Sequence, residues 1–307
     1  MTLALALEQL LNGLQLGVML FLMAAGLTLI FGVMGLINLA HGSLYMVGAF
    51  ACAAVAAATG SFWIGLVASL ACAAAAGAIV ELLVIRRLYD RDHLDQVLAT
   101  FALILIFSEG TRWLFGSFPL YLDIPPLLAG AVPLPGGLQY PVYRLAIIAA
   151  GALIAFGLYI LISKTRLGMR IRAGESDREM IGALGVDIRT LYTVVFALGA
   201  ALAGLAGAMV GALQSVQVGM GEPVLILAFV VIVIGGIGSI KGALFGALLV
   251  GVTDTMGRFL LPQLLALFVP PAQAGMIGGA AASMLIYVVM ALILAVKPRG
   301  LFPAAHA

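Results

Sequence analysis

Polar side chains are scarce in this sequence, and one cluster of them interrupts a long apolar run where a small solute could be bound. The cluster comprises Asn38, His41, Ser43 and Tyr45. An asparagine amide both donates and accepts hydrogen bonds, and a histidine can change its charge near neutral pH. Polar groups in hydrocarbon are costly and usually functional. We predict that the cluster lines a translocation pathway or positions a helix break; a polar helix start near the end of a span is the structural alternative.

A second polar group precedes another apolar run and consists of Gln214, Gln217 and Glu222, followed by Pro223. Glu222 has two interpretations. It caps a helix that begins at Pro223, because the helix dipole favours negative charge there and proline suits the first turn, or it contacts solute. We include all three side chains in the predicted translocation pathway.

The most distinctive polar stretch is the basic segment 164–189. From Ser176, with Glu179 three residues later, a capping box predicts a short helix that Gly185 ends. Its apolar face would comprise Met180, Ala183 and Leu184. A short surface helix of this kind suits a rigid connector to a soluble motor. The alternative, an anchor on anionic lipid, explains the cations but neither the acidic residues nor the caps.

The elements that must position these residues are membrane-spanning helices. Hydrophobic residues make up 64% and charged residues 9%, against about 45–50% and about 25% in soluble domains. A soluble domain is excluded, and long runs apolar on every face exclude an outer-membrane barrel. We predict an all-α polytopic protein with eight to ten spans. The nine candidates are 8–33, 38–58, 62–85, 96–115, 142–163, 190–215, 223–240, 242–261 and 276–296.

The run 222–261 is not continuous. Glycines at 235, 236 and 238 interrupt it, and they are compatible with either a tight hairpin or a break in a re-entrant segment.

Lys and Arg are enriched in cytoplasmic loops, and this bias predicts an orientation. Segment 164–189 holds six of the 15 cations, so we place it in the cytoplasm. Alternating the spans outward from it puts twelve cations on that side, the N-terminus outside and the C-terminus inside. The opposite loop, 116–141, contains six of the 12 prolines and cannot be a regular helix. It is either a folded cap that a soluble partner contacts or only a long connection.

Internal similarity indicates an inverted repeat. Residues 41–50 and 220–229 share a glycine at the second position and a terminal Ala-Phe pair. The alternation of spans gives the two segments opposite directions, as in transporters built from inverted repeats. Small residues spaced by four also predict close helix packing. They are Ala203, Gly207 and Gly211, the pair Gly242 and Gly246, and the pair Gly275 and Gly279.

Several functions are excluded by what the sequence lacks. A net charge of +2 does not indicate a nucleic-acid partner. Residues 235–242 depart from a phosphate-binding loop on both sides of Lys241, and no motif of a hydrolytic enzyme is present. Both cysteines lie in apolar runs and are expected to pack rather than to bind metal. We therefore predict a protein that is not an enzyme and has no cofactor or metal site.

Three segments together resemble the permease subunits of ABC importers for branched-chain amino acids. They are residues 26–42, the loop 166–187, and residues 235–243. The resemblance implies a single permease domain over 1–307, with inverted-repeat architecture, in the bacterial inner membrane. Its partners would be the lipid bilayer, a second permease, two ATPases and a periplasmic solute-binding protein. Lys241 departs from the family pattern, in which this position is often proline.

The resemblance also implies roles for the basic loop. It would contact an ATPase through Glu175, Asp177, Arg178 and Gly185, and the cations Arg166, Arg170 and Arg172 belong to the same coupling segment. The solute would be a branched-chain amino acid, urea, a short amide or an aromatic acid. The alternative function is a secondary transporter or passive channel, which should carry acidic ion-coupling residues at mid-membrane. Such residues are nearly absent.

Overall fold

A computed structural model describes residues 3–89, 91–135 and 137–302 of the chain. Eight of its helices are long and apolar enough to span a membrane, as expected for an all-α polytopic protein. They are α1 (Leu3–Met34), α2 (His41–Thr59), α3 (Phe62–Leu83), α4 (His93–Phe115), α5 (Val142–Lys164), α8 (Ile188–Gly211), α10 (Ile240–Leu265) and α11 (Pro271–Val296). The shorter elements are η1 (Ile85–Arg87), η2 (Pro126–Leu128), β1 (Ala131–Pro133), β2 (Gln139–Pro141), α6 (Arg166–Ser176), α7 (Arg178–Ala183) and α9 (Gly221–Gly235).

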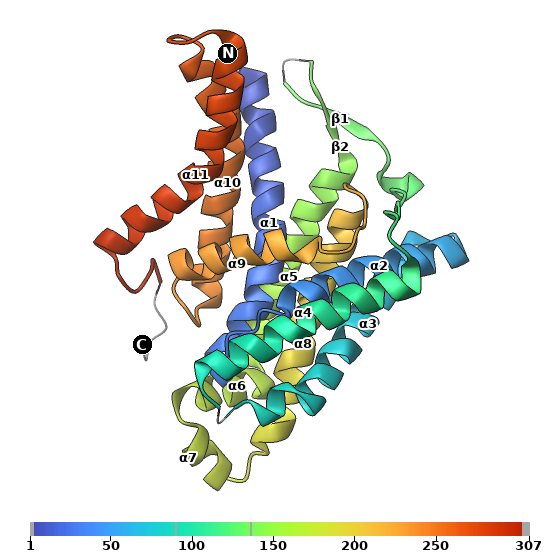
Figure 1. The fold of residues 1–307 in the computed structure, drawn as a ribbon, viewed down its shortest axis with the longest axis vertical. Helices are drawn as coiled ribbons and strands as arrows, with labels where there is room; N and C mark the ends of the chain where they lie inside the picture. Colours follow the sequence, from blue (N-terminus) through green and yellow to red (C-terminus); the bar gives the residue numbers. More distant parts are fainter. Residues whose placement is uncertain (1–2, 90, 136, 303–307) are drawn as a thin grey trace.

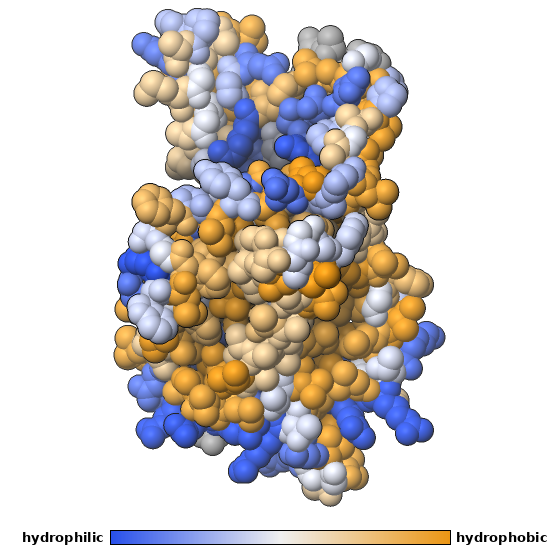
Figure 2. Space-filling model, turned by 90° about the vertical axis from the view of Figure 1, so that its right-hand side faces the viewer, coloured by the Kyte–Doolittle hydropathy of each residue, from blue (hydrophilic) through white to orange (hydrophobic). Residues whose placement is uncertain are grey.

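The surface carries the polarity of a membrane protein. Figure 2 shows a broad hydrophobic belt over one face, with hydrophilic side chains along its lower edge and around a recess near the upper end. The peripheral helices α4, α5 and α11 expose most of their apolar side chains, whereas α1 and α8 are largely buried. Exposed apolar area of this extent is stable only against lipid or another protein.

The prediction of a spanning helix over 223–240 is wrong in length. α9 has 15 residues, or about 22 Å at 1.5 Å per residue, which is less than the roughly 30 Å of the hydrocarbon core. It stops at Gly235 because Gly236 has a φ of 105° and leaves the helical region. The chain then turns tightly into α10, and Gly235 and Gly242 pack against each other on the two sides of the turn.

Helices α1 and α8 form the centre of an inverted repeat. α1 runs from the end marked N to the end that carries α6 and α7, and α8 runs back in the opposite direction (Figure 1). α1 packs most extensively on α10, and α8 packs most extensively on α3. In an inverted repeat, α1, α2 and α3 correspond to α8, α9 and α10. The contact of α1 with α10 then corresponds to the contact of α8 with α3, as expected for repeats of inverted topology.

Two reciprocal glycine contacts mark the approximate two-fold axis between the repeats. A Cβ on Gly26 of α1 would lie 2.5 Å from the carbonyl oxygen of Gly199 of α8, and a Cβ on Gly199 would lie 2.8 Å from the oxygen of Gly26. The first turns of α2 and α9 meet in the same way through Gly42 and Gly221. These are the glycines at the second position of the two similar sequence segments.

Two of the three predicted small-residue contacts occur within the chain. Gly207 of α8 lies directly on the backbone of Tyr45 in α2, and Gly242 of α10 lies on Gly235 of α9. The pair Gly275 and Gly279 makes no such contact within the chain, because a Cβ at either position would meet no atom of the described residues within 4 Å. In α11, Gly278 is the glycine that packs against α10, at Pro262.

The proline-rich segment 116–141 is a folded cap at the end opposite α6 and α7 (Figure 1). Antiparallel strands β1 and β2 pair Val132 with Tyr140. Tyr140 is fully buried, and its hydroxyl donates to Asn12 Oδ1 at 3.2 Å. Leu120 and Val216 form a further bridge to the connection between α8 and α9. Prolines suit these edges because they need not donate to a strand ladder.

Candidate functional site

The first polar cluster lies inside the protein. α1 ends at Met34, and Gly35 has a positive φ of 67° that turns the chain. His41 then begins α2 beside α1, since a Cβ on Gly26 would lie 3.0 Å from His41 Nε2. Gly26 precedes the end of α1 by eight residues, or about 12 Å. α2 therefore begins beside α1 about 12 Å before the end of that helix.

All four side chains of this cluster are buried: Asn38 and His41 are 0% exposed, Ser43 5% and Tyr45 1%. Asn38 Oδ1 accepts a hydrogen bond from the Ala40 amide at 3.0 Å, which stabilises the break. Within the described residues, Asn38 Nδ2 and the Tyr45 hydroxyl make no hydrogen bond, and the His41 imidazole interacts with the backbone of Met23. Each such group costs about 1–3 kcal/mol, so the cluster is a candidate binding site and not a gain in stability.

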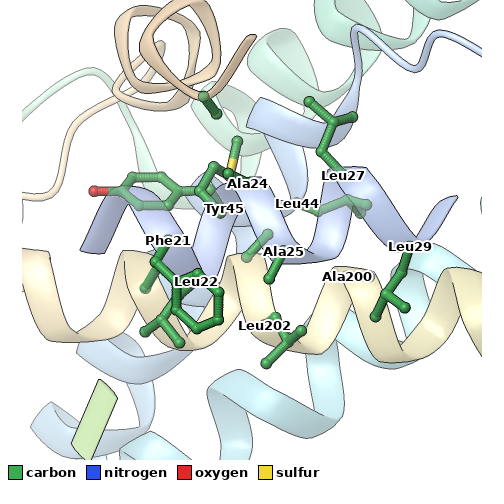
Figure 3. Packing of buried hydrophobic residues seen from close by; sticks show 14 of the residues in the cluster. Phe21, Leu22, Ala24, Ala25, Leu27, Leu29, Leu44, Tyr45, Ala200 and Leu202 are labelled. Atoms are coloured by element: carbon green, nitrogen blue, oxygen red, sulfur yellow. The ribbon is translucent and has the colours of Figure 1, made fainter. Parts of the chain in front are cut away.

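The surroundings of the cluster are apolar and rigid. Figure 3 shows Leu44 and Tyr45 packed among buried side chains of α1, including Phe21 and Leu22, with the Tyr45 hydroxyl at the edge of the group. Ala200 and α8 complete the packing on the other side. A polar group presented from such a wall is held in a fixed direction because close-packed neighbours allow few rotamers.

The second predicted group is only partly brought to this site. Gln214 and Gln217 are exposed in the connection between α8 and α9. Glu222 is also exposed, and it lies in the first turn of α9. The prediction that the helix begins at Pro223 with Glu222 as its cap is wrong by two residues, because α9 starts at Gly221 and Met220 occupies the N-cap. The contact between Gly221 and Gly42 is what connects Glu222 to the buried cluster.

The basic segment folds into two short helices at one end of the molecule (Figure 1). Thr165 caps α6 by accepting from the Gly168 amide at 3.1 Å. The predicted cap at Ser176 is displaced by one residue: Ser176 ends α6, and Asp177 Oδ1 accepts from the Met180 amide at 2.9 Å to begin α7. An N-cap residue has a non-helical backbone. Asp177 meets this requirement because its backbone is extended, whereas Ser176 still belongs to the last turn of α6. α7 ends at Ala183, and Gly185, with a φ of 86°, turns the chain away from the helix, as predicted.

The predicted coupling residues differ in exposure. Arg166, Arg170, Arg172 and Asp177 are exposed, and Glu175 is half-buried. The side chain of Arg178 lies outside the described residues. Met180 and Leu184 project from α7 with 62% and 77% of their surface exposed, whereas the neighbouring Ile181 is buried. The apolar face of α7 is therefore turned away from the rest of the chain.

The cap of α8 gives a pH-dependent prediction. The hydrogen bond from the Thr190 hydroxyl, followed by backbone hydrogen bonds, lowers the pKa of Asp187 below its usual 3.8. A lowered pKa in the folded state stabilises the protein above 3.8, and this contribution is lost as the pH falls through the folded value. We expect acidification to pH 3 to lower the melting temperature in detergent more for the wild type than for Asp187→Asn, which keeps a capping oxygen without titrating. Equal losses would contradict this.

One cavity next to α6 is lined by α1, α5, α6 and the start of α10. Its volume is about 720 Å³. α1 contributes Thr28 and Gly32, α6 contributes Arg172 and Glu175, and the start of α10 contributes Lys241. The cavity thus joins all three segments on which the family resemblance rests. α6 lies against α1 at this cavity, because Glu175 Oε1 lies 3.4 Å from the position of a Cβ on Gly32.

A buried ion pair beside this end of the molecule was missed by the sequence reasoning. Glu81 of α3 is 0% exposed and binds Arg86 through Nε at 3.2 Å and a terminal nitrogen at 3.1 Å. Tyr89 and Thr193 donate to the same carboxylate at 2.8 and 2.7 Å. An acidic residue alone in the apolar run 62–85, five residues before an arginine, is the signal that could have revealed it.

This ion pair connects α3 to the first turns of α8. Burial, and then the hydrogen bond to Glu81, raise the pKa of Tyr89 above its usual range, so the phenol remains a donor at physiological pH. Its ring packs edge-on against Tyr192 of α8 at a centroid distance of 4.9 Å. Because α8 directly follows α7, the ion pair holds α3 to the helix that would transmit movement of the coupling segment.

Helices apolar enough to span a membrane that meet across an inverted repeat beside buried polar side chains are typical of transporters. The class of this protein is therefore a multi-pass membrane transport permease. The sequence profile described as "Branched-chain amino acid transport system / permease component" matches residues 9–296. The chain belongs to this family, as the resemblance of its three segments indicated.

Individual relatives agree. The chain is 32% identical over 265 residues to the high-affinity branched-chain amino acid transport system permease protein BraD of Pseudomonas aeruginosa, which covers 82% of this chain and 86% of the relative. It is 28% identical over 264 residues to the corresponding protein LivH of Escherichia coli, with 81% and 85% covered. A fructose import permease, FrcC of Rhizobium meliloti, is 33% identical over 35% of the chain and 34% of its own length. No solved structure matches the chain.

Proposed function

We propose that this chain is one of two permease subunits of an ATP-driven importer in the bacterial inner membrane. α6 and α7 face the cytoplasm and contact an ATPase, the N-terminus is periplasmic, and the C-terminus is cytoplasmic. The observation that carries this proposal is the exposed apolar face of α7, formed by Met180 and Leu184 at the extreme end of the molecule. An apolar patch beside charged side chains outside the hydrophobic belt is typical of a protein interface.

In the proposed cycle, ATP binding by the partner displaces α6 and α7 together. α6 shifts α1 and α10 through the cavity that they share, and α7 shifts α8 and, through Thr193 and Glu81, α3. α2 and α9 meet at the two-fold axis between these moving helices. Their separation opens the buried cluster of Asn38, His41, Ser43 and Tyr45 to solute, while Gln214, Gln217 and Glu222 line the outer approach. The unpaired polar atoms of the cluster support this role.

A secondary transporter or passive channel is the second candidate, and the buried carboxylates argue against it. Among the described residues, Glu81 and Asp254 are the buried acidic side chains. Each is paired with an arginine, Glu81 with Arg86 at 3.1 Å and Asp254 with Arg258 at 2.9 Å. A coupling ion would need a carboxylate without a fixed counter-charge. Solute flow through proteoliposomes that contain this chain alone, at the rate of the full assembly, would overturn the proposed function.

Copurification tests the ATPase contact. We expect the tagged wild type to retain an ATPase from its source cells, and a variant with Met180→Asp and Leu184→Asp to lose it, since buried carboxylates oppose an apolar interface. Leu267→Asp is a matched control, because Leu267 is 76% exposed in the connection of α10 to α11 at the opposite end of the molecule. Deletion of residues 174–185 should give the same loss. Retention by both variants would contradict the assigned interface.

The transported solute is proposed to be a branched-chain amino acid, delivered by a periplasmic binding protein, because the named relatives are permeases for these amino acids. Uptake of labelled leucine, urea and benzoate by the reconstituted assembly distinguishes the related solute classes. We expect ATP-dependent uptake of leucine. Uptake of urea or benzoate without uptake of leucine would support the proposed importer but contradict the proposed substrate.

A further inference from the structure

The cavity beside α6 has a length that matches one leaflet of a bilayer. Its volume of about 720 Å³ is within the roughly 300–1,000 Å³ of ligand sites. Along α1 its lining extends from Phe21 to Val33, a separation of twelve residues or about 18 Å. Half of the hydrocarbon core is about 15 Å thick. The cavity therefore reaches from the end of the span that carries α6 to the middle of the bilayer.

The walls are apolar and one side faces the bilayer. Phe21 and Leu158 are buried residues of the inner wall. Phe156 and Tyr159 of the peripheral helix α5 also line the cavity, although they are 61% and 50% exposed. These exposed apolar side chains would be covered by lipid in the membrane, so a molecule dissolved in the bilayer would reach the cavity beside α5.

Charged and polar side chains gather at the end next to α6. Arg172 and Lys241 contribute two positive charges and Glu175 one negative charge, so these three leave a net charge of +1. The N-terminus of α10 lies at the same place, where Ser239 Oγ accepts from the Gly242 amide at 3.0 Å, and its dipole adds partial positive charge. A phosphodiester carries one negative charge and complements this end.

A single polar group lies deeper among the apolar walls. Thr28 is 1% exposed, and its hydroxyl has no hydrogen-bond partner within the described residues. It precedes Gly32 by four residues and therefore lies about 6 Å further into the membrane than the charged end. In a glycerophospholipid the ester carbonyl groups lie a few bonds deeper than the phosphate, which places an acceptor near this donor.

We propose that the cavity binds one anionic glycerophospholipid of the adjacent leaflet. Arg172 and Lys241 bind the phosphate, the Thr28 hydroxyl donates to an ester carbonyl oxygen, and an acyl chain extends along Leu29 to Phe21. A transmembrane helix of a partner would need a groove over the full thickness of about 30 Å, and this cavity ends halfway. The site depends on the membrane-embedded fold alone, and not on the ATPase or the transported solute.

Native mass spectrometry of the full-length chain tests the proposal. The protein is extracted in mild detergent, and bound phospholipid is counted after exchange into phosphatidylglycerol or phosphatidylcholine. We expect the wild type to retain one phosphatidylglycerol. Ala155→Phe, which fills the cavity from α5, should remove it, and Lys241→Gln should weaken retention about fivefold, as expected for the loss of one interfacial cation.

Matched controls separate this site from general lipid contact. Leu153→Phe introduces the same ring on the 71% exposed face of α5, and Lys164→Gln removes a charge at the same end of the molecule outside the cavity lining; both should retain lipid like the wild type. The charge variant keeps the test valid if Ala155→Phe fails to fold. Retention that is equal in all variants, or equal for phosphatidylcholine, would overturn the proposal. The proposal would also be overturned if the wild type formed dimers that Ala155→Phe converts to monomers, because a second copy of the chain would then occupy the cavity.

Discussion

Gly221→Ala is expected to produce the largest loss of folded, transporting protein among single substitutions in this chain. A Cβ at this position would lie 1.8 Å from the carbonyl oxygen of Gly42, and 2.5 Å from its carbonyl carbon. Both atoms belong to the backbone, so no side-chain rotation can relieve the overlap, and α2 and α9 must separate at the two-fold axis. Forced overpacking typically costs about 1–3 kcal/mol and occasionally more, and we expect the upper end of this range because both contacts are to backbone atoms.

The reciprocal variant provides an internal comparison. In Gly42→Ala the new Cβ would lie 2.8 Å from the oxygen of Gly221, so we expect a smaller loss. Gly157→Ala is the matched control, because Gly157 lies in a helix with open space around the position of a Cβ, and alanine should be neutral or stabilising by up to about 1 kcal/mol. Thermal melting in detergent and uptake by the reconstituted assembly measure both effects. If Gly221→Ala melts with the control, the meeting of α2 and α9 is not tight.

Glu81→Leu is expected to be the second most damaging substitution. The carboxylate is fully buried and accepts from Arg86, Tyr89 and Thr193. Without it these donors lose their common acceptor, and the contact of α3 with the start of α8 is weakened. Removal of one partner of a buried ion pair typically costs about 3–5 kcal/mol, and we expect about 3 kcal/mol because the Arg86 side chain is 30% exposed.

An exposed ion pair gives the control for this variant. Glu109 and Arg112 of α4 are paired at 2.6 Å with exposed fractions of 68% and 48%, and such pairs contribute about 0–1 kcal/mol. Glu109→Leu should therefore change the melting temperature little. Glu81→Gln keeps an acceptor oxygen and should fall between the two. If ATPase activity remains coupled to uptake in a folded Glu81→Leu protein, the ion pair stabilises the fold without transmitting movement.

Most spans were predictable because the information for them is local. The apolar runs 62–85 and 142–163 correspond to α3 and α5 within two residues, since a helix in lipid must satisfy its own backbone. α9 was overestimated because its last residues remain apolar past the point where Gly236 adopts a positive φ. Hydropathy indicates whether a segment lies in lipid or water, but it does not indicate where the backbone leaves the helical conformation.

The candidate site was predicted by residue type but not by position. The sequence singled out Asn38 and His41 as polar residues in an apolar run, and their 0% exposure makes them part of the site. Gln214 and Gln217 have the same polarity, yet they lie exposed beyond the end of α8. Which polar residues become buried depends on how far the chain folds back beside α1, and the periodicity of the sequence does not record this.

The sequence by itself determined that the chain spans a membrane, that a short capped helix interrupts it near residue 180, and that two segments repeat with opposite direction. Composition, caps and turn glycines act over a few residues, so these features can be read from neighbours along the chain. Only the tertiary structure decided that Gly42 meets Gly221, that Glu81 is paired and buried, and that α1, α5, α6 and α10 enclose one cavity. Such contacts join residues far apart in sequence, and close packing in three dimensions selects them.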